Sequence, residues 1–193
     1  MVPQEVYTIR KPAQVRALRS PARQEIVDGL ASAGPSSAAE LARLLGRTPD
    51  ALYFHLKALQ KVGLVVEREP RKNGRHVAAV YDLPGRPLRL VYESPVRRAD
   101  VAGVVRGALR LSLRDFERGL SAGADSSAGR RVLWGGRVKG WLSPLEIERV
   151  NALLKEVQDV VRNGRPREGT QAVSLGFVLA PAQKSKRAKE AEE

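Results

Sequence analysis

Residues 48–65 read TPDALYFHLKALQKVGLV, and this stretch decides the fold. A threonine followed by a proline, Thr48 and Pro49, supplies a helix N-cap and a favoured first helical residue. The leucines that follow recur at spacings of four and three: Leu52, Leu56 and Leu59. Because this spacing places them on one side of a helix, and Gly63 ends the pattern, we predict a helix over 49–62 with one apolar and one free face.

Two shorter helical patterns precede this one. A serine and a proline at 20–21 begin a helix predicted to run from about 21 to 32. The segment SAAE at 37–40 is a capping box, in which the serine oxygen and the glutamate carboxylate each accept a backbone N–H. Only Gly46 and Arg47 separate this second helix from the third, so the two must cross sharply, as in a helix-turn-helix.

After Gly63 the pattern changes from helical to extended. Valines and a tyrosine, which favour strands, appear on both sides of Asn73-Gly74, a dipeptide suited to a two-residue hairpin turn. Three cations surround that turn: Arg71, Lys72 and Arg75. We therefore expect a β-ribbon with a basic tip.

The segment LPGRP at 83–87 contains two prolines and a glycine, which is typical of a domain boundary. We divide the chain into an N-terminal domain (1–86), a second domain (87–182) and a charged, solvated tail (183–193). In the second domain helical and extended patterns alternate: a helix from Pro95 to about Leu120, a strand over 132–142, a helix opened by Ser143-Pro144, and a strand over 173–179. The predicted fold class is therefore α+β, an N-terminal winged helix-turn-helix followed by a C-terminal α-β-α-β dimerisation domain.

The two long helices of the second domain carry apolar stripes that need a partner surface. We expect them to build a dimer contact through five residues: Val105, Leu109, Phe116, Leu154 and Val157. Trp134 and Trp141 have two interpretations: they line a cavity for a small-molecule effector, or they belong to the core or the dimer interface.

The composition limits the classes of function. The net charge of +13 favours an anionic partner such as nucleic acid. The chain has no cysteine, no signal-peptide pattern and no apolar run long enough to span a membrane, so we expect a cytoplasmic protein with no metal, no cofactor and no membrane contact. We find no GxSxG, GxxxxGK or HExxH motif, and we expect no enzymatic activity.

The order of helix, turn, helix and basic hairpin suits double-stranded DNA, whose major groove admits one helix. The residues opposite the leucines of the third helix should face the groove, together with its N-cap: Thr48, Pro49, Asp50, Tyr53, Phe54 and Lys57. The backbone and flanking contacts are assigned to Ser37, Arg47, Arg71, Lys72 and Arg75.

The segments LYFHLKAL at 52–59 and VGLV at 62–65 resemble the recognition helix of ArsR-type winged helix-turn-helix regulators. The resemblance extends over roughly residues 9–83. It implies a homodimer on a two-fold symmetric operator and repression by excluding polymerase. The cysteines through which well-known members of that family sense metals have no counterpart here.

Two other functions stay open at this point. The high positive charge also suits a sequence-independent architectural protein, and a winged helix can dock protein instead of DNA. The sequence identifies no effector, so a small-molecule partner is left open.

Overall fold

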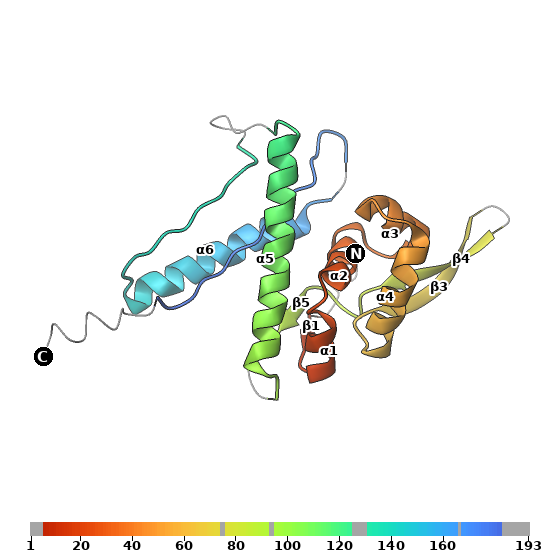
Figure 1. The fold of residues 1–193 in the computed structure, drawn as a ribbon, viewed down its shortest axis with the longest axis horizontal. Helices are drawn as coiled ribbons and strands as arrows, with labels where there is room; N and C mark the ends of the chain where they lie inside the picture. The colour runs from red at the N-terminus through yellow and green to blue at the C-terminus, as the bar shows by residue number, and fades with distance from the viewer. Residues whose placement is uncertain (1–5, 74–75, 93–94, 125–130, 166, 183–193) are drawn as a thin grey trace, which may run out of the picture.

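The N-terminal half contains the three helices that the sequence predicts, preceded by a shorter one. The computed structural model describes residues 6–73, 76–92, 95–124, 131–165 and 167–182 (Figure 1). Its first four helices are α1 (Pro12–Ala17), α2 (Pro21–Ala33), α3 (Ala38–Leu45) and α4 (Pro49–Lys61). The predicted helix starts after Ser20, Ser37 and Thr48 are confirmed, since each of these residues is the N-cap of its helix.

Helix α3 is capped at both ends. Ser37 Oγ accepts a hydrogen bond from the Glu40 N–H at 3.3 Å, and Glu40 Oε2 accepts one from the Ser37 N–H at 2.7 Å. This is the predicted capping box. At the other end Gly46 adopts φ 62° and ψ 40°, a left-handed conformation that glycine reaches without strain. The chain can therefore reverse within two residues and begin α4.

The predicted ribbon follows α4 as an antiparallel hairpin. Its strands are β3 (Val66–Asn73) and β4 (His76–Asp82), and the short β2 (Ser36–Ser37) joins the other edge of β4. The register shifts between Arg68 and Arg71, so the outer part of the ribbon is offset by a bulge. The hairpin loop, residues 74–75, lies outside the described residues, and with it Gly74 and Arg75.

A second, two-stranded sheet ties the two ends of this half together. β1 (Tyr7–Ile9) pairs in parallel with β5 (Leu88–Leu90), with Tyr7 opposite Leu88. The sequence analysis did not predict either strand, because a three-residue strand gives almost no periodic signal and its partner lies about 80 residues away.

One hydrophobic core lies beneath these elements. Its largest buried side chains come from α2, α3 and α4 and from the residues beside the hairpin: Ile26, Leu30, Leu41, Leu52, Leu56, Leu59, Leu64 and Leu83. Each of these is at most 1% exposed. The face of α4 that the leucine spacing predicts to be apolar is therefore the one that the core buries.

The next helix, α5 (Arg98–Ser121), packs against α1 and α2. Its predicted start at Pro95 is wrong, because Val96 is buried in the core and Arg97 is an extended N-cap. Gln24 Nε2 on α2 donates to the Val104 carbonyl oxygen at 2.9 Å, and Arg19 pairs with Asp100 at 3.1 Å. The division of the chain at residue 86 stays a prediction, although these contacts join α5 to the first half.

The last part of the chain contains one helix, α6 (Pro144–Asn163), opened by the predicted capping box of Ser143 and Glu146. The two strands predicted over 132–142 and 173–179 are wrong for this structure, which gives both segments an extended course without strand pairing. A strand needs a partner for its backbone groups, and sequence periodicity does not reveal whether the chain provides one. In the described part of the chain, no helix has the length and hydropathy that a membrane-spanning helix requires.

Candidate nucleic-acid interface

Helix α4 has one face in the core and one face in solvent. Leu52, Leu56 and Leu59 are at most 1% exposed, whereas Tyr53 is 44% and Phe54 is 70% exposed. A large aromatic side chain with most of its surface in water is unusual beside a well-packed core. The outward face is therefore available to a partner.

The structure brings together all six residues predicted for the recognition helix. Each is exposed, and they lie on α4 or at its N-cap: Thr48, Pro49, Asp50, Tyr53, Phe54 and Lys57. The Thr48 side chain makes no capping hydrogen bond. The backbone N–H groups of the first turn thus point outward without a side-chain cap, as a phosphate contact requires. Contact of these residues with DNA stays a prediction.

Arg71 connects the hairpin to the helix-turn-helix. Its Nη1 lies 3.0 Å from Glu40 Oε1 and its Nη2 donates to the Pro35 carbonyl oxygen at 3.4 Å. The backbone N–H of Ser37 lowers the pKa of Glu40, with smaller contributions from the Ser37 hydroxyl and Arg71, so the carboxylate is ionised at neutral pH. Arg71 therefore links the hairpin to the start of α3. Lys72 is exposed beside it, and Arg75 lies outside the described residues.

The other two residues predicted to contact the DNA backbone are engaged inside the chain. Ser37 is buried, and its hydroxyl takes part in the capping box. Arg47, in the turn before α4, places Nη2 at 2.5 Å from Glu25 Oε2 on α2. Arg114 on α5 approaches the other oxygen of the same carboxylate at 2.7 Å. Glu25 was not among the predicted residues, and its only signal in the sequence is a charged residue directly before the apolar Ile26 and Val27 of α2.

His55 lies beside the outward face of α4. Its ring contacts the Phe54 ring edge to face at a centroid distance of 5.4 Å. Burial lowers the pKa of His55, and the nearby guanidiniums of Arg23 and Arg47 lower it further. The imidazole is therefore neutral at pH 7, and the histidine adds no charge to this face.

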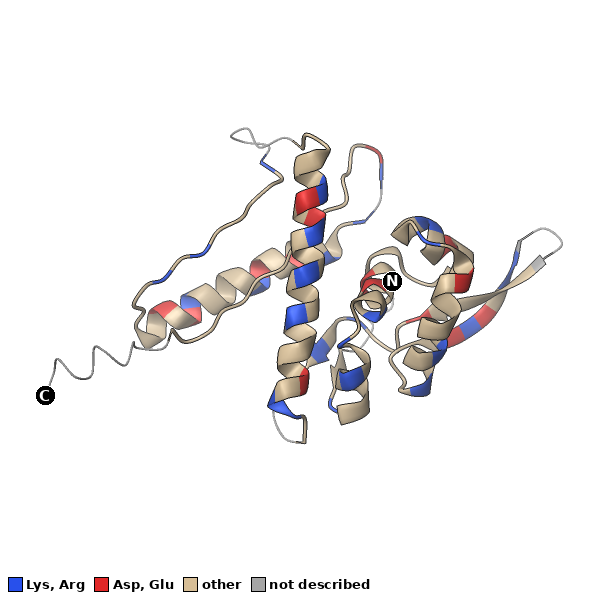
Figure 2. Ribbon diagram, in the orientation of Figure 1, with Lys and Arg blue, Asp and Glu red and all other residues tan. Residues whose placement is uncertain are grey.

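Positive charge extends beyond the predicted residues. Figure 2 shows lysines and arginines on α3, α4 and β3 of the helix-turn-helix and hairpin, and along α5. Arg43 on α3 is exposed and forms no ion pair within the described chain. The sequence signal that could have found it is its place on the polar side of the second helix, between Glu40 and Arg47.

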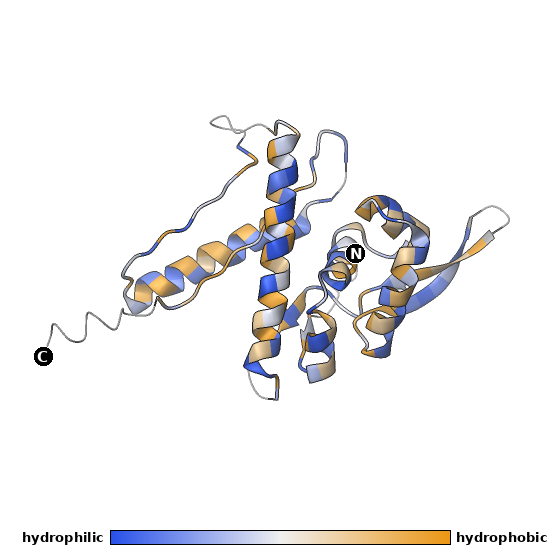
Figure 3. Cartoon of the chain, viewed as in Figure 1, coloured by the Kyte–Doolittle hydropathy of each residue, from blue (hydrophilic) through white to orange (hydrophobic). Residues whose placement is uncertain are grey.

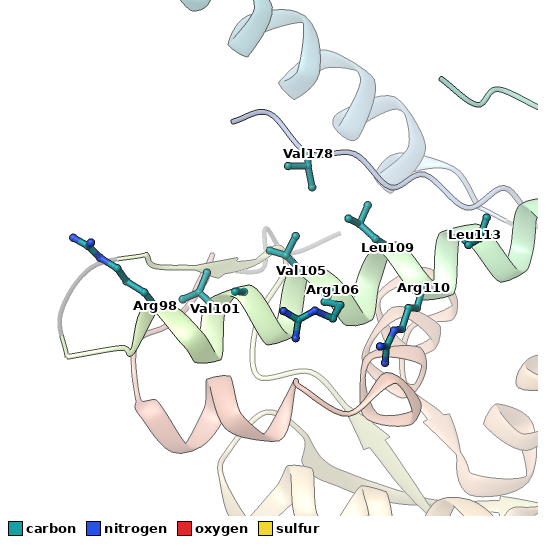
Figure 4. Close-up of a pocket in the computed structure, with 9 residues that line it drawn as sticks. Arg98, Val101, Val105, Arg106, Leu109, Arg110, Leu113 and Val178 are labelled. Atoms are coloured by element: carbon teal, nitrogen blue, oxygen red, sulfur yellow. The ribbon is translucent and has the colours of Figure 1, made fainter. Parts of the chain in front are cut away.

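An open groove of about 580 Å³ runs along the side of α5 that faces away from α2. Val105, Leu109 and Leu113 line it on α5, and Val178 lies across from them (Figure 4). Trp134 and Trp141 do not line this groove and are 75% and 87% exposed, so they do not belong to the core of the described chain.

The comparisons with known proteins give a match within the first half of the chain. Residues 18–68 match the family model of a helix-turn-helix domain, which is about a quarter of the chain. The match runs from the end of α1 through α2, α3 and α4 into β3. No curated protein matches the chain. The chain is thus an α+β protein with an N-terminal helix-turn-helix domain, and DNA is the partner that this domain indicates.

Proposed function

We propose that the chain is a homodimeric transcription regulator that binds an inverted-repeat operator and represses by excluding polymerase. The observation that carries the proposal is the outward face of α4, where Tyr53, Phe54 and Lys57 stand exposed on a helix whose other face is buried. The proposal assigns the chain no catalysis and assumes that it meets DNA in the cytoplasm.

The exposed side chains of α4 suit base recognition in a major groove about 12 Å wide. Lys57 can donate to a guanine edge, Tyr53 can hydrogen-bond a base or a phosphate, and Phe54 can pack on a thymine methyl group. The hairpin and its cations lie beside the same helix, where flanking phosphates would pass.

A dimer is favoured by the second half of the chain. None of the 20 residues of α6 is buried, although Leu145, Leu153 and Val160 are 75%, 51% and 70% exposed. Figure 3 shows apolar residues along the whole helix. Of the residues predicted for dimerisation, Leu109 and Val157 are 40% and 46% exposed, while Val105, Phe116 and Leu154 are half-buried. Surfaces of this kind mark interaction sites in soluble proteins.

Selection of duplexes from a random pool tests the proposal. We expect an inverted repeat whose half-sites lie about one helical turn apart, because a two-fold dimer presents two copies of α4. A specificity ratio above about a thousand against unrelated duplexes would exclude a purely architectural protein, whose +13 charge would bind every duplex alike. If no sequence is enriched, the proposal is wrong.

A pair of lysine variants tests whether α4 contacts the bases while the hairpin contacts the phosphates. Lys57→Ala should change the preferred site, because Lys57 faces the bases in the proposed complex. Lys72→Ala should weaken binding to all duplexes similarly and reduce the salt slope by about one, because it removes a phosphate contact. The two residues are both exposed, so each variant is the control for the other. Identical effects would contradict these roles.

A further inference from the structure

The extended segment 171–182 has a backbone without partners. It contains no charged residue, and the structure gives it no strand pairing and no backbone hydrogen bond within the described chain. Such a row of free N–H and C=O groups is a template for another strand, and natural edge strands normally carry charges that prevent this. Because residues 171–182 carry no charge, nothing in their sequence prevents another strand from pairing with them.

One side of this segment already faces α5. A Cβ at Gly176 would come within 2.1 Å of Ser112 Oγ on α5, so only a glycine allows this approach. Val178, two residues later on the same side of an extended chain, lines the groove with Val105 and Leu109 (Figure 4). Val178 is itself 54% exposed, and the alternate residues are 42–55% exposed: Val173, Leu175, Phe177 and Leu179. The segment thus has the placement of a strand on a helix, with both edges open.

The other extended segment, 131–142, is poorly suited to pair with a copy of itself. It contains Arg131, Arg137 and Lys139, which would come together across a two-fold axis, and three glycines that weaken a strand. The uncharged segment 171–182 meets no such repulsion when two copies run antiparallel.

We propose that residues 171–182 pair antiparallel with the same residues of a second copy, forming a β-ladder across the two-fold axis of the dimer. This rests on the homodimer proposed above and adds the element that joins its subunits. The ladder satisfies the free backbone groups and extends the apolar face of Val173, Leu175, Phe177 and Leu179 over both copies.

Single-cysteine variants of the full chain test this pairing, because the protein has no cysteine of its own. A two-fold antiparallel ladder places one residue directly opposite its own copy, at a Cα distance of about 4.5–5.5 Å that a disulfide can bridge. We expect one position among 172–180 to give several times more covalent dimer on mild oxidation than its neighbours. Val138→Cys is the control for random collision, because Val138 is 95% exposed on the segment 131–142.

Mixtures of two variants give an independent measurement of the register. Positions on opposite sides of the axis should crosslink only when the two variants are mixed, with residue numbers that always add to the same value. This measurement also covers the case in which the axis passes through Gly176, where a cysteine would collide with Ser112.

Three results would overturn the pairing. The first is a yield of covalent dimer no higher than that of Val138→Cys at every position, together with no crosslink in any mixture of two variants. Sedimentation of the same sample would then show whether the protein is still a dimer without this pairing. A monomer that still binds DNA would remove the dimer and the ladder together. An internal disulfide in Trp134→Cys/Phe177→Cys, formed without dimer, would show that the segment pairs with residues 131–142 of its own chain.

Discussion

Two guanidiniums from different elements meet on one carboxylate. Glu25 on α2 is 9% exposed and receives Arg47 from the helix-turn-helix and Arg114 from α5. The two cations share the single negative charge of this carboxylate, and each of its oxygens has its own partner. A single residue therefore connects the turn that positions α4 with the helix that leads into the second half.

We expect Glu25→Gln to lower the free energy of unfolding by about 2 kcal/mol, measured by urea denaturation. The amide keeps the shape but removes the counter-charge of Arg47, whereas Arg114 keeps its ion pair with Asp115 at 3.0 Å. The cost is below that of a fully buried pair because both guanidiniums are about one third exposed. Glu148→Gln, an exposed residue of α6 without an ion pair in the described chain, should change the value by less than about 0.5 kcal/mol. Equal stabilities of the two variants would refute the role of Glu25.

Asp28, one turn after Glu25, should make stability depend on pH. Loss of solvation raises its pKa to about 6, and repulsion from Glu25 and Asp115 contributes. Because this pKa is above the ordinary value of 3.8, the folded chain holds the proton more tightly than the unfolded chain. The ionised carboxylate therefore costs stability at pH 7, and the cost disappears as the pH falls through 6 towards 4.

Asp28→Asn should accordingly be more stable than the parent chain at pH 7. We expect a difference of about 1 kcal/mol or less, because Asp28 is only partly withdrawn from solvent and the water that still reaches it screens the repulsion. Urea denaturation at a series of pH values should show the difference shrinking below pH 6 and vanishing near pH 4. A difference that is constant with pH would mean that Asp28 does not titrate in this range.

Among the helices and strands, the features that the sequence predicts are those determined by residues close together in the chain. The starts of α2, α3 and α4 follow from N-caps and prolines, and the buried face of α4 follows from three leucines. The candidate recognition residues follow from the same spacing. The engagement of Arg47 inside the chain did not follow, because it depends on where the turn before α4 meets α2 in space.

The left-handed residue between α3 and α4 offers a test at this scale. Gly46→Ala should lower the free energy of unfolding by about 1 kcal/mol, because a Cβ disfavours φ 62° even though no neighbour would touch it. Gly136→Ala is the matched control, since a Cβ at Gly136 also meets no neighbour and its φ is not in the left-handed region. Similar urea midpoints for the two variants would show that the turn tolerates a side chain.

In the molecule as a whole, the buried residues are unevenly distributed along the chain. Every buried residue of the described chain lies at or before Leu111, in the segment from β1 to the first part of α5. The segment 143–182 contributes none, although it carries a large share of the exposed apolar side chains. The first half can therefore keep its core without this segment, whereas the segment needs another surface to cover it.

A truncated chain that ends at Leu142 should still fold but should no longer form the dimer. We expect it to unfold cooperatively, because no buried side chain is removed, and to sediment as a monomer, because α6 and residues 171–182 are gone. Its affinity for a single half-site should be retained, while its affinity for the full inverted repeat should fall by about a hundredfold or more, since the two half-sites are no longer bound by one linked dimer. Sedimentation velocity and titration of the two duplexes measure these effects. A truncated chain that remains a tight dimer would place the subunit contact in the first half of the chain or along α5 alone.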